Sequence, residues 1–266
     1  MRRLSLPLWL ISGFLYLFMY APIAVVIVFS FNAAHHGGPW TGFTTQWYGR
    51  LLDSADKIAA TKNTLVLAVV STLIATVLGT MLGYGLSRYW FPGKKLFSWL
   101  MYIPVVIPDI VMAVALLAFF KELGNALKFF TMGIMTMIIA HITFQIPFVA
   151  IVVRSRLAGI DPAIEEAAHD LGASSWQTFW SVTFPMMVPG VLAGAMLAFT
   201  LSLDDFVVSF FTTGPGATTL PILIYSSVKR GITPDINALS TLIVLASVVG
   251  TIGVTLLQRP RQPSGG

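Results

Sequence analysis

Three aspartates lie within stretches of the chain that are otherwise almost wholly apolar: Asp109, Asp204 and Asp205. An ionisable group inside a membrane-spanning segment is costly, so it is by default a candidate for function. Lysine and arginine are absent from the middle of these stretches, so a transported cation could supply the missing charge. The alternative is structural, because a carboxylate can also cap a broken helix or accept hydrogen bonds from free backbone N–H groups.

The neighbours of these aspartates indicate where helices break. Asp109 follows Pro108, with Pro104 four residues before Pro108, and prolines interrupt the hydrogen bonding of a helix. Asp204 and Asp205 are adjacent, so on a helix they point about 100° apart. At most one of the two can face fully into a lumen, and the other must find a partner near a helix boundary or the outer surface.

Two further polar side chains share one helix face, since His141 and Gln145 are four residues apart. They could line a solute path, but we favour the interpretation that they join neighbouring helices by hydrogen bonds. The pair His35-His36 lies in a loop without a third ligand at helix spacing, so the sequence predicts no metal site there.

The sequence contains no constellation of residues suited to catalysis. It has neither a glycine-rich phosphate loop with lysine nor a His-Glu-x-x-His zinc motif, no serine with an adjacent base is evident, and cysteine is absent. We therefore expect a chain that is not an enzyme, with no catalytic residue, no metal site and no cofactor of its own. An intramembrane enzyme and a stand-alone secondary transporter are the alternatives from other classes, although no duplicated halves are visible.

Membrane-spanning helices are the elements that would position these residues. The chain is 56% apolar and 10% charged, against about 25% charged in a soluble domain. A span needs about 20 apolar residues, and six stretches qualify: 8–31, 64–86, 99–120, 132–153, 186–211 and 238–257. The predicted fold is all-α and integral to the membrane, with one transmembrane domain over residues 1–258 and a flexible tail at 259–266.

Basic residues give the orientation of these spans. Arg2 and Arg3 precede the first span, which is too long for the apolar region of a signal peptide. A cytoplasmic N-terminus then places nine of the 16 lysines and arginines inside. The basic balance is thus a topology signal, and no basic run suggests a nucleic-acid partner.

Two outer segments and two glycine pairs add further expectations. The first outer loop carries aromatic side chains that are either interfacial or in contact with an external binding protein, and these are Trp40, Phe43, Trp47 and Tyr48. Residues 220–228 are apolar but too short to span, so they predict a short helix at the outer interface. The spacings Gly79-x-x-x-Gly83 and Gly190-x-x-x-Gly194 favour a close approach of helices.

A polar island at residues 161–185 separates two apolar stretches and reads DPAIEEAAHDLGASSWQTFWSVTFP. Its initial Asp-Pro is typical of a helix start, and Gly172 fits the left-handed residue that ends such a helix. Ser174 with Gln177 predicts a capping box for a second short helix, which should end near Pro185. The sequence therefore predicts a helix, a glycine elbow and a second helix, and the alanines of the first helix would let another surface approach closely.

The island also resembles the EAA motif of the membrane subunits of ABC importers, E-A-A-x3-G-x9-I-x-L-P. The matching residues are Glu166, Ala167, Ala168, Gly172 and Pro185, with Val182 and Phe184 in place of isoleucine and leucine. The resemblance implies a cytoplasmic coupling loop at about 154–185, whose helix docks into an ATP-hydrolysing partner. It also implies a six-helix ABC importer permease fold in the bacterial cytoplasmic (inner) membrane.

Further segments extend this resemblance over nearly the whole chain. The segments FTLSLDD at 199–205 and TGPG at 213–216, with the outer-loop pattern, resemble the spermidine/putrescine importer permeases, and more narrowly the second subunit of their permease pair. This implies ATP-driven uptake of polyamines by alternating access. Importers of iron(III), sulfate or thiosulfate, and phosphonate share the architecture and remain alternatives. The candidate residues along the solute path are Asp109, Asp204, Asp205, Tyr84 and Phe144, the last two because aromatic faces suit an alkyl-ammonium ligand.

Partners follow from the same resemblance. They are a homologous second permease, two ATP-binding subunits that would hold ATP and magnesium, an external (periplasmic) solute-binding protein and membrane lipid.

Overall fold

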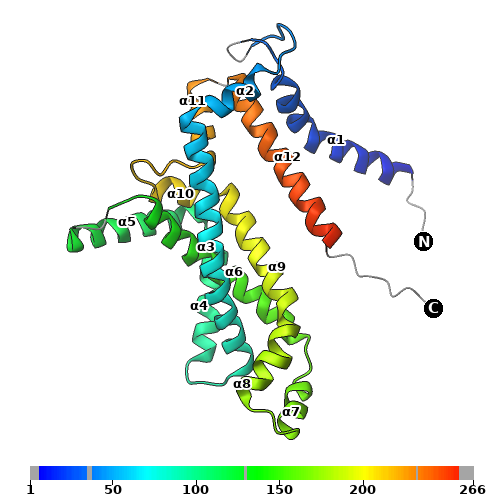
Figure 1. Cartoon of the computed structure of the whole chain (residues 1–266), viewed down its shortest axis with the longest axis vertical. Helices are drawn as coiled ribbons and strands as arrows, with labels where there is room; N and C mark the ends of the chain where they lie inside the picture. Colours follow the sequence, from blue (N-terminus) through cyan, green and yellow to red (C-terminus); the bar gives the residue numbers. More distant parts are fainter. Residues whose placement is uncertain (1–5, 35–37, 129–130, 232, 258–266) are drawn as a thin grey trace. The chain divides into compact units, whose positions relative to one another are not determined.

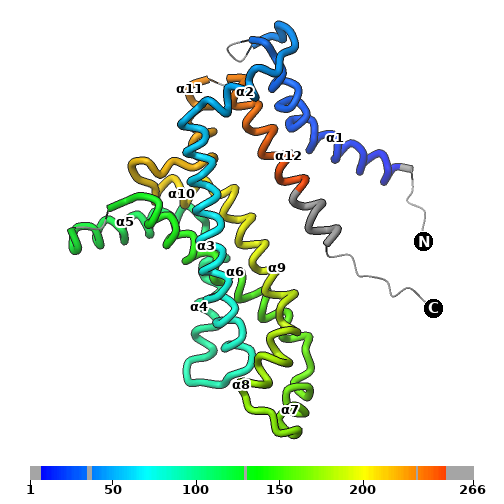
Figure 2. The backbone as a smooth tube through the Cα atoms, in the orientation of Figure 1, coloured from blue at the N-terminus to red at the C-terminus, as the bar shows by residue number. Residues whose placement is uncertain are grey.

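The structure is a computed structural model that describes residues 6–34, 38–128, 131–231 and 233–257 (Figure 1; Figure 2). Within these ranges regular structure is helical throughout, apart from one isolated bridge between Asn32 and Phe43. Five of the described helices are long and apolar enough to cross a membrane, which confirms the predicted all-α class. Arg2, Arg3, the pair His35-His36 and the tail from residue 259 lie outside the described residues.

The described chain divides into two compact units, one drawn from Met1–Ile58 and Ile224–Gly266 and the other from Ala59–Leu223. In the first unit, α12 (Pro234–Leu257) contacts α1 (Leu6–Phe29) and α2 (Gln46–Asp53). Lys57 Nζ lies 2.6 Å from Asp235 Oδ2, which ties the start of α3 (Ala55–Arg88) to the start of α12. The short helix predicted at 220–228 is present as α11 (Leu220–Arg230).

Asn32 organises the loop between α1 and α2. Its Oδ1 accepts from Thr41 N at 3.0 Å, and its backbone carbonyl accepts from Trp47 Nε1 at 2.7 Å. Trp47 is consequently buried, whereas Trp40 and Phe43 are exposed. Within this aromatic loop, Trp47 therefore belongs to the packing of the first unit, and Trp40 and Phe43 are accessible to lipid or to a partner.

The second unit is built around α6 (Ile134–Ala158), which packs against α3 and against α9 (Phe184–Asp204); the latter runs beside it in Figure 1. Val149 of α6 is fully buried between the two. A Cβ on Gly79 would lie 2.6 Å from Val149 Cβ, and one on Gly194 would lie 3.2 Å from Val149 Cγ1. The close approach predicted for both glycine pairs is confirmed, and both pairs meet the same helix; their other members lie against Ala150 (Gly83) and Arg156 (Gly190).

Replacing Gly79 by alanine is expected to destabilise the second unit by about 1–3 kcal/mol, the usual cost of overpacking. The added methyl group would meet both Val149 Cβ at 2.6 Å and the carbonyl oxygen of Ile146 at 2.9 Å. Gly85 lies on the same helix, and a Cβ added there would meet no heavy atom of another part of the chain within 4 Å, so Gly85→Ala is the matched control. Thermal unfolding of the detergent-solubilised variants measures the difference, and equal stabilities would contradict this packing.

The predicted span at 99–120 is not one continuous helix, and its break lies at Pro108, where the prolines indicated that the helix is interrupted. It is divided into α4 (Lys94–Val106) and α5 (Asp109–Leu127). The cause is Pro108, which has no N–H to donate and holds the preceding Ile107 in an extended conformation with ψ 133°. Asp109 therefore begins α5 instead of lying inside a longer span.

The predicted span at 186–211 is also interrupted. It ends as α9 at Asp204, and α10 (Val207–Thr212) begins after Asp205, which is extended with ψ 120°. α10 contacts α5 and α6. In the last predicted span, α12 contains a shorter apolar segment, Pro234–Val249, within the described side chains.

Candidate functional site

The polar island folds into an elbow of two helical limbs, traced through α7 and α8 in Figure 2. Its first limb is α7 (Ala163–Asp170), which begins where predicted, because Asp161 Oδ1 accepts from Ala163 N at 3.0 Å. The helix closes at Gly172, whose φ of +85° is the predicted left-handed conformation. Ala173 N then donates to Ala168 O at 3.0 Å, which satisfies a carbonyl at the end of the limb.

The second limb starts as predicted but ends elsewhere. Ser174 Oγ accepts from Gln177 N at 3.3 Å, and Ser174 N donates to Gln177 Oε1 at 2.8 Å, so the capping box is confirmed. The expected end near Pro185 is wrong. Instead α8 (Ser175–Thr178) continues through a π-helical turn, η1 (Phe179–Thr183), into α9. Pro185 has no N–H, and it is tolerated here because it lies in the first turn of α9, directly after the wider π turn.

The outer face of the elbow is exposed and carries several large apolar side chains among polar ones. No residue of α7 is buried, and both Glu166 and Ala167 are exposed. Leu171 is 90% exposed and Trp176 is 71% exposed, and Trp180 is exposed as well. Large apolar side chains are equally exposed elsewhere in this chain, for example Trp90 at 85%, so those of the elbow are accessible to either lipid or a partner protein. The remaining motif residues are a half-buried Ala168 and an exposed Pro185.

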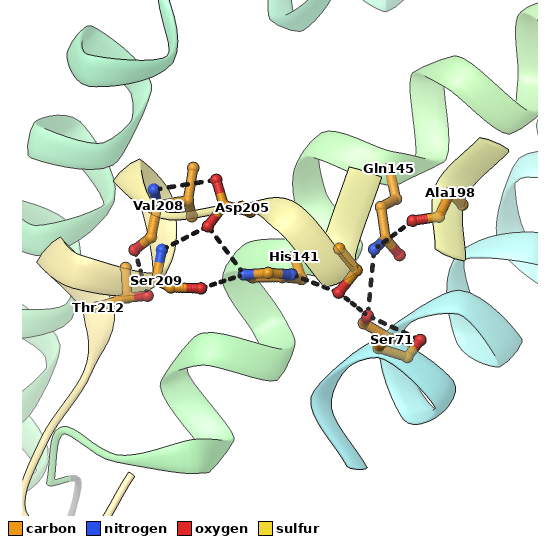
Figure 3. A network of polar contacts seen from close by, with 10 residues as sticks. Ser71, His141, Gln145, Ala198, Asp205, Val208, Ser209 and Thr212 are labelled. Atoms are coloured by element: carbon orange, nitrogen blue, oxygen red, sulfur yellow. Dashed lines mark hydrogen bonds and ion pairs between the residues drawn. The ribbon is translucent and has the colours of Figure 1, made fainter. Parts of the chain in front are cut away.

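A second arrangement of functional interest is a buried polar network around His141 (Figure 3). The imidazole is fully buried on α6, with Nδ1 2.7 Å from Ser202 Oγ and Nε2 3.0 Å from Ser209 Oγ. Gln145, one turn further along α6, donates from Nε2 to Ser71 Oγ at 3.1 Å and to Ala198 O at 3.2 Å. The network joins α3, α6, α9 and α10, which is the helix-joining role that we favoured for His141 and Gln145.

Asp205 belongs to this network and holds the break between α9 and α10. Its carboxylate accepts from Val208 N at 3.2 Å and from Ser209 N at 2.7 Å, so it caps the start of α10. His141 Nε2 lies 3.4 Å from Asp205 Oδ2. A proton on Nε2 suits this carboxylate, and Nδ1 then accepts from the Ser202 hydroxyl group. This pair could not be predicted from sequence spacing, because the two residues lie far apart in the chain.

The other candidates for the solute path lie in different surroundings. Asp204 is the last residue of α9 and Asp109 the first of α5, and both side chains are exposed. Phe144 is 9% exposed, with its ring centroid 5.1 Å from that of His141. Tyr84 instead lies near the elbow, with its ring centroid 5.1 Å from that of Phe179. The structure thus groups Phe144 and Asp205 around His141 and places Tyr84 elsewhere.

Metal ligands do not cluster in the part of the chain that the structure describes. Those residues contain no group of three or more histidine, cysteine, aspartate or glutamate side chains that could hold a metal ion.

Residues 75–260 match the model of the family described as "Binding-protein-dependent transport system inner membrane component". The chain is 42% identical over 252 residues to the spermidine/putrescine transport system permease protein PotC of Shigella flexneri, covering 95% of this chain and 94% of that protein. It is 42% identical over 245 residues to the putrescine transport system permease protein PotI of Escherichia coli (strain K12), covering 91% of this chain and 87% of that protein.

Among solved structures, the chain is similar to a bacterial alginate ABC transporter in complex with an alginate pentasaccharide-bound periplasmic protein. The TM-score is 0.75 at 21% sequence identity, with 97% of this chain and 95% of that chain covered. At this identity the likeness concerns the fold alone.

Proposed function

Because the chain belongs to the family of inner membrane components of binding-protein-dependent transport systems, we propose that it is one permease subunit of an ATP-driven importer of polyamines. It would correspond to the second permease of the pair and would transport by alternating access. It would couple to ATP hydrolysis in another chain, and its solute would be a polyamine.

The exposed elbow is the observation that carries the coupling. It offers small residues beside a left-handed glycine and a rim of exposed apolar side chains, a shape that suits insertion into a cleft of a partner protein. We assign the contact with the ATP-binding subunit to Glu166, Ala167, Ala168, Gly172 and Pro185. Those subunits would hold ATP and magnesium. Their closure would move the elbow and open the permease pair outward, and hydrolysis would reset it.

A polyamine is the solute that the carboxylates support best. Asp204 and Asp109 are exposed at helix ends within the apolar part of the chain, and a di- or tri-cation could meet more than one carboxylate along its path. A sulfate or phosphonate anion would be repelled by the same groups. The relatives named for spermidine and putrescine point the same way. We therefore propose Asp204 and Asp109 as solute contacts, and Asp205 and Phe144 as residues that hold the surrounding helices. Tyr84 is assigned a contact with the elbow, through the ring of Phe179, instead of a contact with the solute.

The assembly and its placement complete the proposal. The chain would span the bacterial inner membrane several times with its N-terminus in the cytoplasm, as a permease domain over residues 1–258 with a coupling loop at 154–185 and a flexible tail at 259–266. It would work with a second permease, two ATP-binding subunits and a periplasmic solute-binding protein.

Thiol labelling tests this orientation on a clean background, because the chain has no native cysteine. A cysteine at Ser174, in the elbow, is expected to react with a membrane-impermeant reagent only from the cytoplasmic side. A cysteine at Ala55, at the start of α3, is expected to react only from outside. Both positions are exposed, so access and not burial decides the result. Labelling of position 174 from outside would overturn both the orientation and the role of the elbow.

Transport by the reconstituted complex tests the function itself. Proteoliposomes with both permeases, the ATP-binding subunits and the binding protein are expected to accumulate labelled putrescine or spermidine when ATP is supplied, and not labelled sulfate. Accumulation of sulfate without polyamine uptake would assign the importer to an anion. Uptake that is independent of ATP would favour a secondary transporter.

A further inference from the structure

The last two turns of α3 contact both limbs of the elbow. Arg88, the final residue of α3, places Nε 3.0 Å from Glu165 Oε1 of α7, and its Nη2 donates to Ile160 O at 3.5 Å. The Arg88 and Glu165 side chains are only 15% and 19% exposed. A charged hydrogen bond that is largely withdrawn from water is stronger than a bridge on the open surface. It therefore fixes α7 to the end of α3.

Tyr84, one turn earlier on α3, reaches the second limb. Its ring centroid lies 5.1 Å from that of Phe179, the first residue of the π-helical turn η1. Tyr84 also packs on the buried cluster that includes Leu157 and Met187. The charge pair of Arg88 and the ring contact of Tyr84 thus fix both limbs of the elbow to the end of α3.

The adjacent glutamates of α7 have different surroundings. Glu165 is turned to Arg88, whereas Glu166 is exposed on the outer face of the elbow. Neighbouring positions on a helix point about 100° apart, so the two carboxylates cannot serve the same contact. One faces the membrane helices of this chain, and the other faces outward.

The helix α3 continues without a break from Arg88 back to Ser71, which bonds to Gln145 in the polar network. Between these points Gly79 and Gly83 hold α3 tightly against α6. A displacement of the elbow would therefore be carried along a rigid, closely packed helix to the network that surrounds the break at Asp205.

We propose that Arg88 and Glu165 form a positioning pair that transmits movement of the ATPase-docking elbow to α3. The inference rests on the proposed function. The elbow is joined covalently to α9, and the Arg88–Glu165 pair joins it to α3 as well. The contacts of Arg88 and Glu165 in the described residues join α3, α7 and Ile160 of this chain. Their effect is on how strongly ATP hydrolysis responds to the solute.

Charge reversal in the reconstituted complex tests this pair. Arg88→Glu and Glu165→Arg are each expected to lower the ratio of putrescine-stimulated to basal ATP hydrolysis at least fivefold, with putrescine uptake falling in parallel. The complex should still co-purify. The double variant Arg88→Glu/Glu165→Arg should recover at least half of the ratio. Lys95→Glu is the matched control: Lys95 is exposed in the first turn of α4, outside the coupling loop, so reversing its charge should leave the ratio unchanged.

Several results would overturn the inference. These are an unchanged ratio in both single variants, a double variant that assembles without recovery, or an equal loss in Lys95→Glu. Loss of co-purification in the single variants would also contradict the inference, because the pair would then have a structural role only. Glu165→Gln keeps a hydrogen-bond acceptor without the charge, and full stimulation in this variant would support that structural role. Failure of the proposed function is distinguishable, since the unmodified complex would itself lack stimulation by putrescine.

Discussion

Replacing Gly172 by valine is expected to lower solute-stimulated ATP hydrolysis by the assembled complex at least tenfold. The φ of Gly172 is +85°, a region that a β-branched residue rarely adopts. A Cβ at this position would meet no heavy atom within 4 Å, so the effect arises from the backbone and not from a clash. The strain is relieved by turning the chain at the elbow. That turn would separate Ala173 N from Ala168 O and displace α7 from the docking position.

The matched control for this variant is Gly172→Asn, because asparagine tolerates the left-handed conformation far better than valine. It is expected to retain most of the stimulated ATP hydrolysis. Membrane insertion of both variants is checked by thiol labelling at Ser174. Normal stimulation in Gly172→Val would remove the elbow from the coupling mechanism, and equal loss in both variants would point to the added side chain instead of the backbone.

The second large effect is expected at Asp204. Asp204→Asn keeps the shape and the hydrogen-bonding capacity while removing the charge, and it should lower putrescine and spermidine uptake at least tenfold. Asp205→Asn should change uptake much less, because asparagine also caps a helix and can still accept from Val208 N or Ser209 N. Asp205→Ala removes the cap and should cost about 1–2 kcal/mol of stability. Uptake of labelled polyamine and thermal unfolding in detergent separate these effects.

The contrast between the two aspartates makes the assignment testable. If Asp205→Asn abolishes uptake while Asp204→Asn does not, the solute contact has been given to the wrong neighbour. If Asp109→Asn, Asp204→Asn and Asp205→Asn all transport polyamines at the unmodified rate, the carboxylates are structural. The polyamine assignment would then rest on the similarity to named relatives alone.

The elbow was largely predictable because its determinants are local. The side chain of Asp161 accepts from Ala163 N, that of Ser174 accepts from Gln177 N, and Gly172 supplies the left-handed turn. Each signal therefore acts within a few residues of its partner. The continuation of the second limb was not predictable in the same way. Proline usually ends a helix because it has no N–H to donate. Here a π-helical turn precedes Pro185, and the helix continues into α9 despite the missing hydrogen bond.

The polar network depends on distant residues, and sequence spacing revealed only half of it. The shared face of His141 and Gln145 followed from helix periodicity, but their partners Ser71 and Ser202 come from other helices. The break at Asp205 contains neither proline nor glycine, so the local sequence does not indicate it. It is held by the contact of its carboxylate with the start of α10 and with His141, which only the packed arrangement reveals.

Cross-linking from the elbow tests the central claim most directly. A thiol-reactive photo-cross-linker attached to Ala167→Cys, in membranes that contain the complete complex, is predicted to join this chain to the ATP-binding subunit. The same reagent on Ala55→Cys is predicted to give no such product, although both positions are exposed. A missing product from position 167 in an active complex, or the same product from position 55, would contradict the account.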